Sequence, residues 1–325
     1  MKHKQILVMV PCSGEQKQRL LQAAGEHTVI FAQRGEQIFE QALPQAHIIF
    51  GEPTIAELQR AHNIEWVQMT WAGTDIYTAQ KGFPEQAVLT NASGAFGAVI
   101  SEYIIGAILM LYRNFPCYLQ QQKQAVWCDA GSERTLYGKR VLILGAGDIG
   151  TNTAERLRPF GTYLVGLRRV PRAQNTCFDE IIGMEQLEQQ LSQADIVIGC
   201  LPNTPKTAGL LKANRLYKMK PDAILVNVGR GSLLPLDDLT AVLQSGHLSG
   251  VVLDVTEIEP LPHDHPLWHM QNVILTPHIA GPSLGHAPHT EQLIHDIFLE
   301  NLQRLSQGKP LRSRVDFQTG YRALE

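Results

Sequence analysis

The chain has 325 residues, of which 44% are hydrophobic and 18% are charged, and its formal net charge is −3. This length suits two domains with well-buried cores. The small net charge, with acids and bases interspersed, does not indicate binding to nucleic acid or to an anionic membrane. The sequence shows no signal-like N-terminus and no long apolar span, so we expect a cytoplasmic protein.

The first hundred residues alternate short apolar runs with polar, periodic stretches. Runs of this kind predict buried strands, and the stretches between them predict helices of a small α/β unit. The expected strands are 6–10, 28–32, 47–51, 66–70 and 88–91, and the expected helices include 15–24 and 55–61.

A long apolar helix is expected over 98–112, followed by a polar stretch over 119–134. The apolar run 141–144 then ends in Gly145-Ala146-Gly147-Asp148-Ile149-Gly150, a Gly-x-Gly-x-x-Gly motif. In such a motif the first glycine permits a tight turn, the second lets the backbone approach a pyrophosphate, and the third lets the helix pack closely on the strand.

The residues after the motif complete a βαβ unit. Ala154, Leu157 and Phe160 follow at helical spacing, and the apolar run 163–167 has the pattern of the next strand. The sequence therefore predicts a dinucleotide site at Gly145, Gly147 and Gly150.

The end of that second strand indicates which dinucleotide binds. NAD-binding units carry an acid about 20 residues past the motif, but this chain has Arg168-Arg169, with Arg172 shortly after. Guanidinium groups can pair with a 2′-phosphate, so we expect NADP(H), with NAD as the alternative. The competing interpretation is that these arginines only solvate a surface turn.

Further apolar runs over 195–201, 223–228, 248–255 and 272–276 continue the alternation. Near-continuous apolar runs suit parallel strands that are buried on both faces of a doubly wound sheet. A helix over roughly 291–305 precedes a polar tail that is too short for a domain of its own. We expect this segment to return to the N-terminal unit, which leaves a cleft between two domains for substrate.

Three loops at the expected carboxyl ends of these strands carry an arginine, acids and a histidine. Arg230 can hold a carboxylate and polarise a neighbouring carbonyl. His278 can exchange a proton with the reacting oxygen, and Glu259 can stabilise the imidazolium, with Glu257 as a rival for that role. Asp254 ends a strand and either caps a turn or accepts a hydrogen bond from the nicotinamide carboxamide. The set fits hydride transfer to a 2-keto acid.

The remaining histidines and the cysteines give no convincing metal site. His286 and His289 form a His-x-x-His pair, but Pro288 opposes the helix that would align them as ligands. The five cysteines include no Cys-x-x-Cys pair. We therefore expect no metal.

Taken together, these motifs resemble the D-isomer-specific 2-hydroxyacid dehydrogenases over most of the chain. The matching stretches are 71–75, 101–103, 136–150, 201–207, 219–221, 226–231, 253–262 and 276–281. The resemblance places the active-site residues at Arg230, Glu259 and His278. The family's glutamate directly precedes a proline, which here is Pro260 and favours Glu259 over Glu257.

The resemblance also implies the ligand contacts. Substrate would meet Trp71, Ala72, Gly73, Arg230 and His278. Cofactor would meet Gly145, Gly147, Asp148, Ile149, Gly150, Arg168, Arg169, Leu201, Pro202, Thr207, Val228, Gly229, Arg230, Asp254 and His278.

The architecture implied by the resemblance is a Rossmann-type cofactor domain over 98–285, inserted in a flavodoxin-like substrate domain made of 1–97 and 286–325. Family members are commonly homodimers, and 118–127 would be the dimerisation arm. Arg168 stands where NAD-preferring members of the family carry an acid, so it favours the NADPH-dependent glyoxylate and hydroxypyruvate reductases within the family. The alternative is a nucleotide-sensing protein of the corepressor type, because those proteins resemble the same family and keep its triad.

Overall fold

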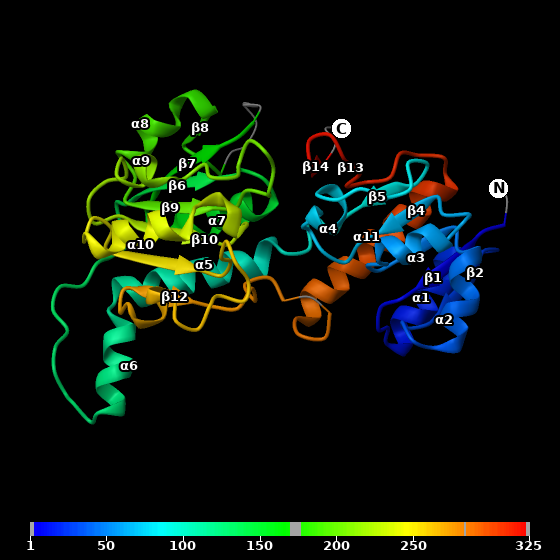
Figure 1. Cartoon of the computed structure of the whole chain (residues 1–325), viewed down its shortest axis with the longest axis horizontal. Coiled ribbons are helices and arrows are strands. Elements are labelled where there is room, and N and C mark those ends of the chain that lie inside the picture. The colour runs from blue at the N-terminus through cyan, green and yellow to red at the C-terminus, as the bar shows by residue number, and fades with distance from the viewer. Residues whose placement is uncertain (1–2, 170–176, 283, 323–325) are drawn as a thin grey trace. The chain divides into compact units, whose positions relative to one another are not determined.

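The computed structural model describes residues 3–169, 177–282 and 284–322. The chain divides into two compact units, one made of Met1–Phe96 with Pro282–Glu325 and the other of Gly97–Gly281. Each unit has its own parallel sheet with helices (Figure 1). The prediction of an α/β protein with two doubly wound parallel sheets is confirmed.

The first unit is built on a five-stranded parallel sheet with the order β2-β1-β3-β4-β5. This is the order of flavodoxin-like folds. The strands are β1 (Gln5–Val8), β2 (Thr28–Phe31), β3 (Ile48–Phe50), β4 (Trp66–Gln68) and β5 (Val88–Thr90). The helices are α1 (Gly14–Ala24), α2 (Gln37–Ala42), α3 (Ile55–Arg60), α4 (Asp75–Thr78) and α11 (Pro288–Ser306), and a short hairpin joins β13 (Val315–Asp316) to β14 (Tyr321–Arg322).

Helix α11 ties the C-terminal segment to this unit. It packs on α1, where Arg19 pairs with Asp296 at 2.6 Å. On the sheet side, the buried ring of Phe298 stacks on Phe50 with 4.3 Å between ring centroids. Burial of two such rings stabilises the fold by several kcal/mol, at roughly 25 cal/mol per Å².

The second unit is built on a seven-stranded parallel sheet with the order β12-β11-β10-β9-β6-β7-β8. Counted from β6, the order is that of a Rossmann fold extended by one strand. The strands are β6 (Arg140–Leu144), β7 (Tyr163–Leu167), β8 (Glu180–Ile182), β9 (Ile196–Gly199), β10 (Ile224–Asn227), β11 (Gly250–Leu253) and β12 (Val273–Leu275). The helices are α5 (Gly97–Tyr112), α6 (Phe115–Lys123), α7 (Asp148–Leu157), α8 (Leu187–Leu191), α9 (Ala213–Leu216) and α10 (Leu236–Gln244).

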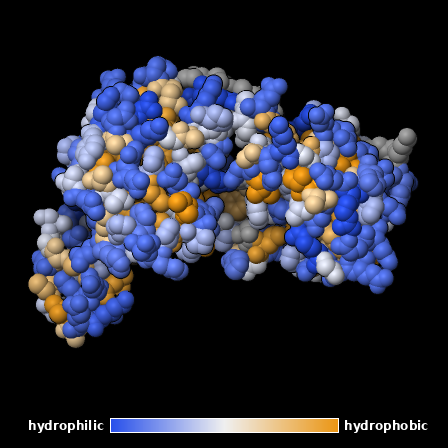
Figure 2. Space-filling model, in the orientation of Figure 1, coloured by the Kyte–Doolittle hydropathy of each residue, from blue (hydrophilic) through white to orange (hydrophobic). Residues whose placement is uncertain are grey.

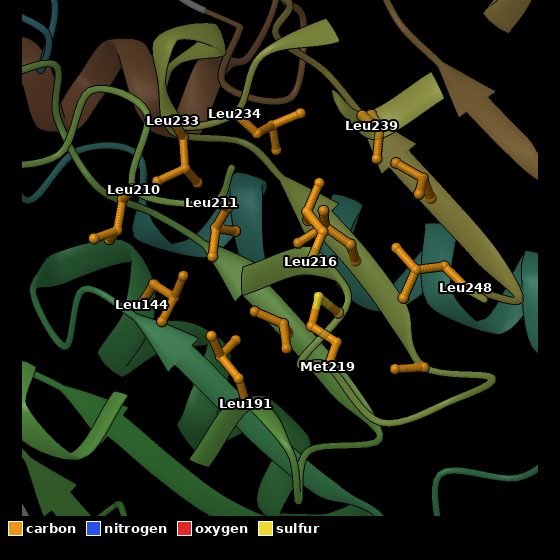
Figure 3. Packing of buried hydrophobic residues seen from close by; sticks show 14 of the residues in the cluster. Leu144, Leu191, Leu210, Leu211, Leu216, Met219, Leu233, Leu234, Leu239 and Leu248 are labelled. Carbon is orange, nitrogen blue, oxygen red and sulfur yellow. The ribbon is translucent and has the colours of Figure 1, made fainter. Parts of the chain in front are cut away.

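The core of the second unit is rich in leucine. Side chains from β6, α8, α9 and α10 interdigitate above one face of the sheet (Figure 3). Every residue of β9, β10 and β11 is buried, as expected of strands covered on both faces. The close packing of this core fixes where the strands end, and therefore where the loops after them lie.

Helices α5 and α6 follow each other directly, and the chain bends by 68° between them. Within the described residues, no single helix is long and apolar enough to cross a membrane. Only α5 and α6 taken together reach that length and apolar composition. Helix α5 packs on α7, β10 and β11, and half of its residues are buried.

Helix α6 and the loop after it carry exposed apolar side chains. Phe115, Leu119 and Val126 are about half exposed, and Trp127 is fully exposed. Figure 2 shows hydrophobic residues among polar ones over this arm. The homodimerisation role of 118–127 stays a prediction.

Candidate functional site

The glycine motif adopts the geometry that a pyrophosphate seat needs. Gly145 lies between β6 and α7 with a φ of +110°, which L side chains rarely adopt. A Cβ on Gly150 would lie 2.1 Å from the Gly145 carbonyl oxygen, so only glycine permits this close approach. A Cβ on Gly147 would meet nothing within 4 Å, which leaves open space beside the first turn of α7. These residues fit a dinucleotide, whose phosphates would occupy that space.

Arg168 lies directly beside this glycine turn. The carbonyl oxygen of Leu167, at the end of β7, accepts hydrogen bonds from the N–H groups of Gly145 and Ala146 at 3.1 and 2.9 Å. Arg168 follows that carbonyl and is half-buried, while Arg169 is exposed. The contact of these two arginines with the adenosine ribose of a dinucleotide stays a prediction. Arg172 lies outside the described residues.

The loops after β9 and β10 pack against each other through Gly229. A Cβ on Gly229 would lie 2.5 Å from the Leu201 carbonyl oxygen. In the Leu201 loop, the Thr207 hydroxyl donates to the Pro202 carbonyl at 2.6 Å, so Thr207 closes the turn. Val228 and Gly229 are both buried where the two loops meet, and the contact there is largely between backbone atoms.

Arg230 is held by its own loop. Asn227 donates from Nδ2 to the Arg230 carbonyl at 2.9 Å, and the Arg230 guanidinium donates to the Gly229 carbonyl at 2.8 Å. A Cβ on the next residue, Gly231, would lie 1.8 Å from the Thr256 carbonyl oxygen, so the loops after β10 and β11 are in direct contact. This contact brings Arg230 into the same loop cluster as the acids after β11.

His278 pairs with Glu259 and not with Glu257. The distance from His278 Nδ1 to Glu259 Oε2 is 2.9 Å, and both side chains are about half exposed. Glu259 is oriented in turn by the Thr256 N–H, which donates to its other oxygen at 3.0 Å. Glu257 accepts from the Leu236 N–H at the start of α10. The pairing leaves Nε2 of His278 available to a substrate oxygen.

Asp254 organises the histidine loop, so its carboxylate has the turn-capping role that was one of the two alternatives for this residue, and its contact with the nicotinamide stays a prediction. Its carboxylate is buried and accepts from the Thr276 hydroxyl at 2.6 Å, from the Ile279 N–H at 2.8 Å and from the Ala280 N–H at 2.9 Å. Its backbone carbonyl accepts from the His278 N–H at 2.8 Å. His278 itself has a φ of +56°, an unusual conformation that this wrapping maintains.

Tyr103 supports the same loop from α5. Its hydroxyl lies 2.6 Å from the Thr276 hydroxyl, and burial raises its pKa, so the phenol stays neutral and can donate. The stretch 101–103 matched the family pattern, but nothing in the sequence indicated this contact.

In the first unit, the carbonyl groups of Trp71 and Ala72 are held by the segment after β5. The Trp71 carbonyl accepts from the Ala92 N–H at 2.9 Å, and the Ala72 carbonyl accepts from Asn91 Nδ2 at 2.6 Å. The N–H groups of Ala72 and Gly73 donate to no residue within the described part of the chain. Two adjacent N–H groups of this kind suit a carboxylate. Trp71 is exposed beside them.

No metal centre is apparent in the part of the chain that the structure describes. Within residues 3–169, 177–282 and 284–322, no group of three or more His, Cys, Asp or Glu side chains could hold a metal ion.

Comparisons with known proteins show which family the chain is similar to. Residues 105–280 match the model of the family described as D-isomer specific 2-hydroxyacid dehydrogenase, NAD binding domain. The chain is 33% identical over 225 residues to glyoxylate/hydroxypyruvate reductase A of Salmonella newport, which covers 69% of this chain and 70% of that protein.

Two solved structures share the whole fold. A D-isomer specific 2-hydroxyacid dehydrogenase family protein from Aeromonas salmonicida is 35% identical with a TM-score of 0.85, over 97% of this chain and 100% of that one. A D-isomer specific 2-hydroxyacid dehydrogenase from Xanthobacter autotrophicus, solved with NADPH and MES, is 29% identical with a TM-score of 0.83, over 98% of this chain and 100% of that one.

Proposed function

The chain belongs to the D-isomer specific 2-hydroxyacid dehydrogenase family, and from this premise we propose that it reduces small 2-keto acids of the glyoxylate and hydroxypyruvate type to D-2-hydroxy acids with NADPH. The observation that carries the proposal is the His278–Glu259 pair in one loop cluster with Arg230. The reductase from Salmonella and the NADPH complex from Xanthobacter support the substrate class and the cofactor.

Each residue has a chemical task in this proposal. The first unit supplies the N–H groups of Ala72 and Gly73 for the substrate carboxylate. In the second unit, Arg230 supplies a fork of donors that can bind a carboxylate and polarise a neighbouring keto oxygen. When bound, NADPH supplies the hydride. His278 gives its proton to the oxygen that becomes the hydroxyl, and Glu259 stabilises the imidazolium before that transfer.

A substrate panel with both cofactors tests the function. We expect glyoxylate and hydroxypyruvate to be reduced at measurable rates, with absorbance loss at the nicotinamide band as the readout and chiral analysis showing the D product. If NADPH and NADH bind but neither is oxidised with any 2-keto acid, the enzyme proposal fails and the nucleotide-sensing alternative takes its place.

Cofactor preference is tested at Arg168. If the arginines after β7 bind a 2′-phosphate, Arg168→Asp with Arg169→Ala should weaken NADPH binding by about 10- to 100-fold, since charge-assisted hydrogen bonds contribute roughly 1.5–3 kcal/mol. NADH affinity should change little, and fluorescence titration measures both.

The chain offers a matched charge control for this experiment. Arg113→Asp makes the same change of charge as Arg168→Asp, at an exposed arginine after α5 that pairs with Glu133. This control should leave the ratio of the two affinities unchanged. Equal losses of NADPH and NADH affinity in the Arg168 variant would refute recognition of the 2′-phosphate.

A further inference from the structure

A cavity of about 550 Å³ opens at the carboxyl edge of the first unit's sheet. Its wall includes Met9 and Val10 after β1, Gly51 and Glu52 after β3, and Trp71 after β4. Strands β1 and β3 are adjacent, and the chain leaves β1 toward β2 on the other side, so the cavity lies at the topological switch point. Ligands of open α/β sheets bind at this point. The fold itself therefore indicates a ligand site here.

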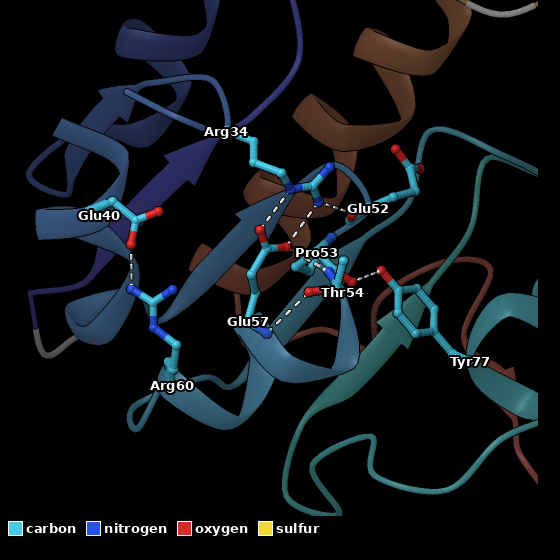
Figure 4. Close-up of polar contacts among 8 residues, drawn as sticks. All are labelled: Arg34, Glu40, Glu52, Pro53, Thr54, Glu57, Arg60 and Tyr77. Atoms are coloured by element: carbon cyan, nitrogen blue, oxygen red, sulfur yellow. Dashed lines mark hydrogen bonds and ion pairs between the residues drawn. The ribbon is translucent and has the colours of Figure 1, made fainter. Parts of the chain in front are cut away.

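Hydrogen bonds and an ion pair connect the loop that carries Glu52 to its neighbours (Figure 4). Arg34 makes a forked pair with Glu57 at 2.6 and 2.9 Å and also donates to the Glu52 carbonyl at 3.2 Å. The Tyr77 hydroxyl donates to the Pro53 carbonyl at 2.6 Å. A loop fixed on both sides presents the Glu52 side chain with little loss of conformational entropy on binding.

Among the described charged residues that line the cavity, Glu52 is the one whose side chain is not in an ion pair. The positive charge of Arg34, the other charged residue that lines the cavity, is already neutralised by Glu57. The Glu52 Oε1 atom accepts from the Thr70 N–H at 2.6 Å and from the Thr70 hydroxyl at 2.9 Å, and the Trp71 N–H is a third hydrogen-bond partner of this carboxylate. An ionised carboxylate has about four acceptor positions, so one position remains for a donor from a ligand. Burial raises the pKa of Glu52, and such a donor would favour the ionised form again.

Trp71 connects the cavity to the proposed substrate site. Its side chain lines the cavity, and its neighbours Ala72 and Gly73 offer the N–H groups proposed for the substrate carboxylate. A carboxylate bound by these N–H groups would therefore have a wall residue of the cavity as its neighbour. The cavity volume is typical of sites for ligands larger than a two-carbon or three-carbon acid.

We propose that this cavity receives the side chain of the 2-keto acid and that Glu52 accepts a hydrogen bond from a hydroxyl, ammonium or guanidinium group on it. The inference rests on the proposed function and makes donor-bearing 2-keto acids the preferred members of its substrate class, of which hydroxypyruvate is the shortest. Longer, positively charged members fit the volume and the charge of the wall best.

Two matched substrate pairs test the proposal. In each pair the chain length is similar: hydroxypyruvate and 2-oxobutanoate differ in a hydroxyl group, and 2-oxo-5-guanidinopentanoate and 2-oxooctanoate differ in a guanidinium group and its positive charge. We expect the unaltered protein to prefer the donor-bearing member of each pair by about tenfold or more in kcat/KM, because a buried acceptor left unpaired penalises the apolar member.

Variants at Glu52 separate this role from a structural one. Glu52→Leu should remove both preferences, mainly through KM. Glu52→Gln keeps an acceptor oxygen but no charge, so it should keep the hydroxyl preference and lose about tenfold for the guanidinium acid. Glu85→Gln, at an exposed acid of the same unit, is the control and should change neither. Thermal unfolding shows whether each variant is folded.

The outcomes distinguish this inference from the proposed function. A protein that reduces both members of each pair equally, or a folded Glu52→Leu variant that keeps the preferences, would overturn the inference while the proposed function stands. If no 2-keto acid is reduced, the proposed function fails. Calorimetric titration with the same pairs then tests separately whether the cavity binds donor-bearing side chains. Equal affinity for the two members of each pair would reject that binding role.

Discussion

Replacing His278 with alanine should abolish turnover and leave NADPH binding largely intact. The imidazole is the proposed proton donor, and loss of a positioned general acid typically costs about 10²–10⁴ in rate. His278 pairs with Glu259 through Nδ1, so its removal takes away the donor without disturbing the glycine turn after β6. Steady-state rates and NADPH fluorescence titration on the same preparation measure the two effects.

A matched histidine makes the experiment specific. His269 is exposed in the same unit, and His269→Ala should retain both turnover and NADPH affinity. Turnover by His278→Ala within a few-fold of the unaltered protein would remove the proton-donor role. An equally large loss of NADPH affinity would assign His278 to cofactor binding instead.

Replacing Asp254 with alanine should weaken the second unit and the catalytic loop together. The change leaves the Thr276 hydroxyl and the N–H groups of Ile279 and Ala280 without their buried acceptor. Unsatisfied buried donors cost about 1–3 kcal/mol each, so we expect a loss of roughly 3 kcal/mol or more in the free energy of unfolding, a large share of the 5–15 kcal/mol typical of domains. Urea denaturation followed by circular dichroism measures it.

The effect of an Asp254 substitution on the turnover rate distinguishes this residue from a carboxylate that only stabilises the fold. The same hydrogen bonds hold His278 in its unusual backbone conformation, and a misplacement of about 1 Å in a catalytic group can cost 10²-fold in rate. Asp254→Asn keeps the volume and one acceptor oxygen, so it should fold and still lose most of its activity. Asp264→Ala, at an exposed acid of the same unit, is the control. Unaltered stability and rate in Asp254→Ala would contradict this account.

The pattern of apolar residues predicted where most strands lie, but it did not predict at which residue they end. The run 195–201 contains β9, but the strand ends at Gly199 because Leu201 is buried in a loop that packs against Gly229. Similarly, Val255 is buried beyond the end of β11. Burial and strand hydrogen bonding coincide inside the sheet but not in the loops that cover its edge, so hydrophobicity extends the predicted strands too far.

Some short elements were absent from the sequence interpretation. Strand β8 has only three residues and lies at the sheet edge, so its apolar signal is weak. Helix α10 did carry a signal, since Leu236, Leu239, Val242 and Leu243 lie on one buried face at helical spacing. The polar stretch after 119 contains the end of α6, whose apolar side chains point outward and obscure the periodicity.

The sequence by itself determined the two parallel sheets, the glycine turn and the candidate residues Arg230, Glu259 and His278, because strand patterns and motif spacings are local properties of the chain. The family pattern around Pro260 favoured Glu259 over Glu257, but only the tertiary structure showed that Glu259 contacts His278, that Glu257 caps α10 and that Asp254 holds the histidine loop. It also brought Glu52 and Trp71 to one cavity. These relations join loops that follow different strands, and their geometry exists only when the strands pack side by side.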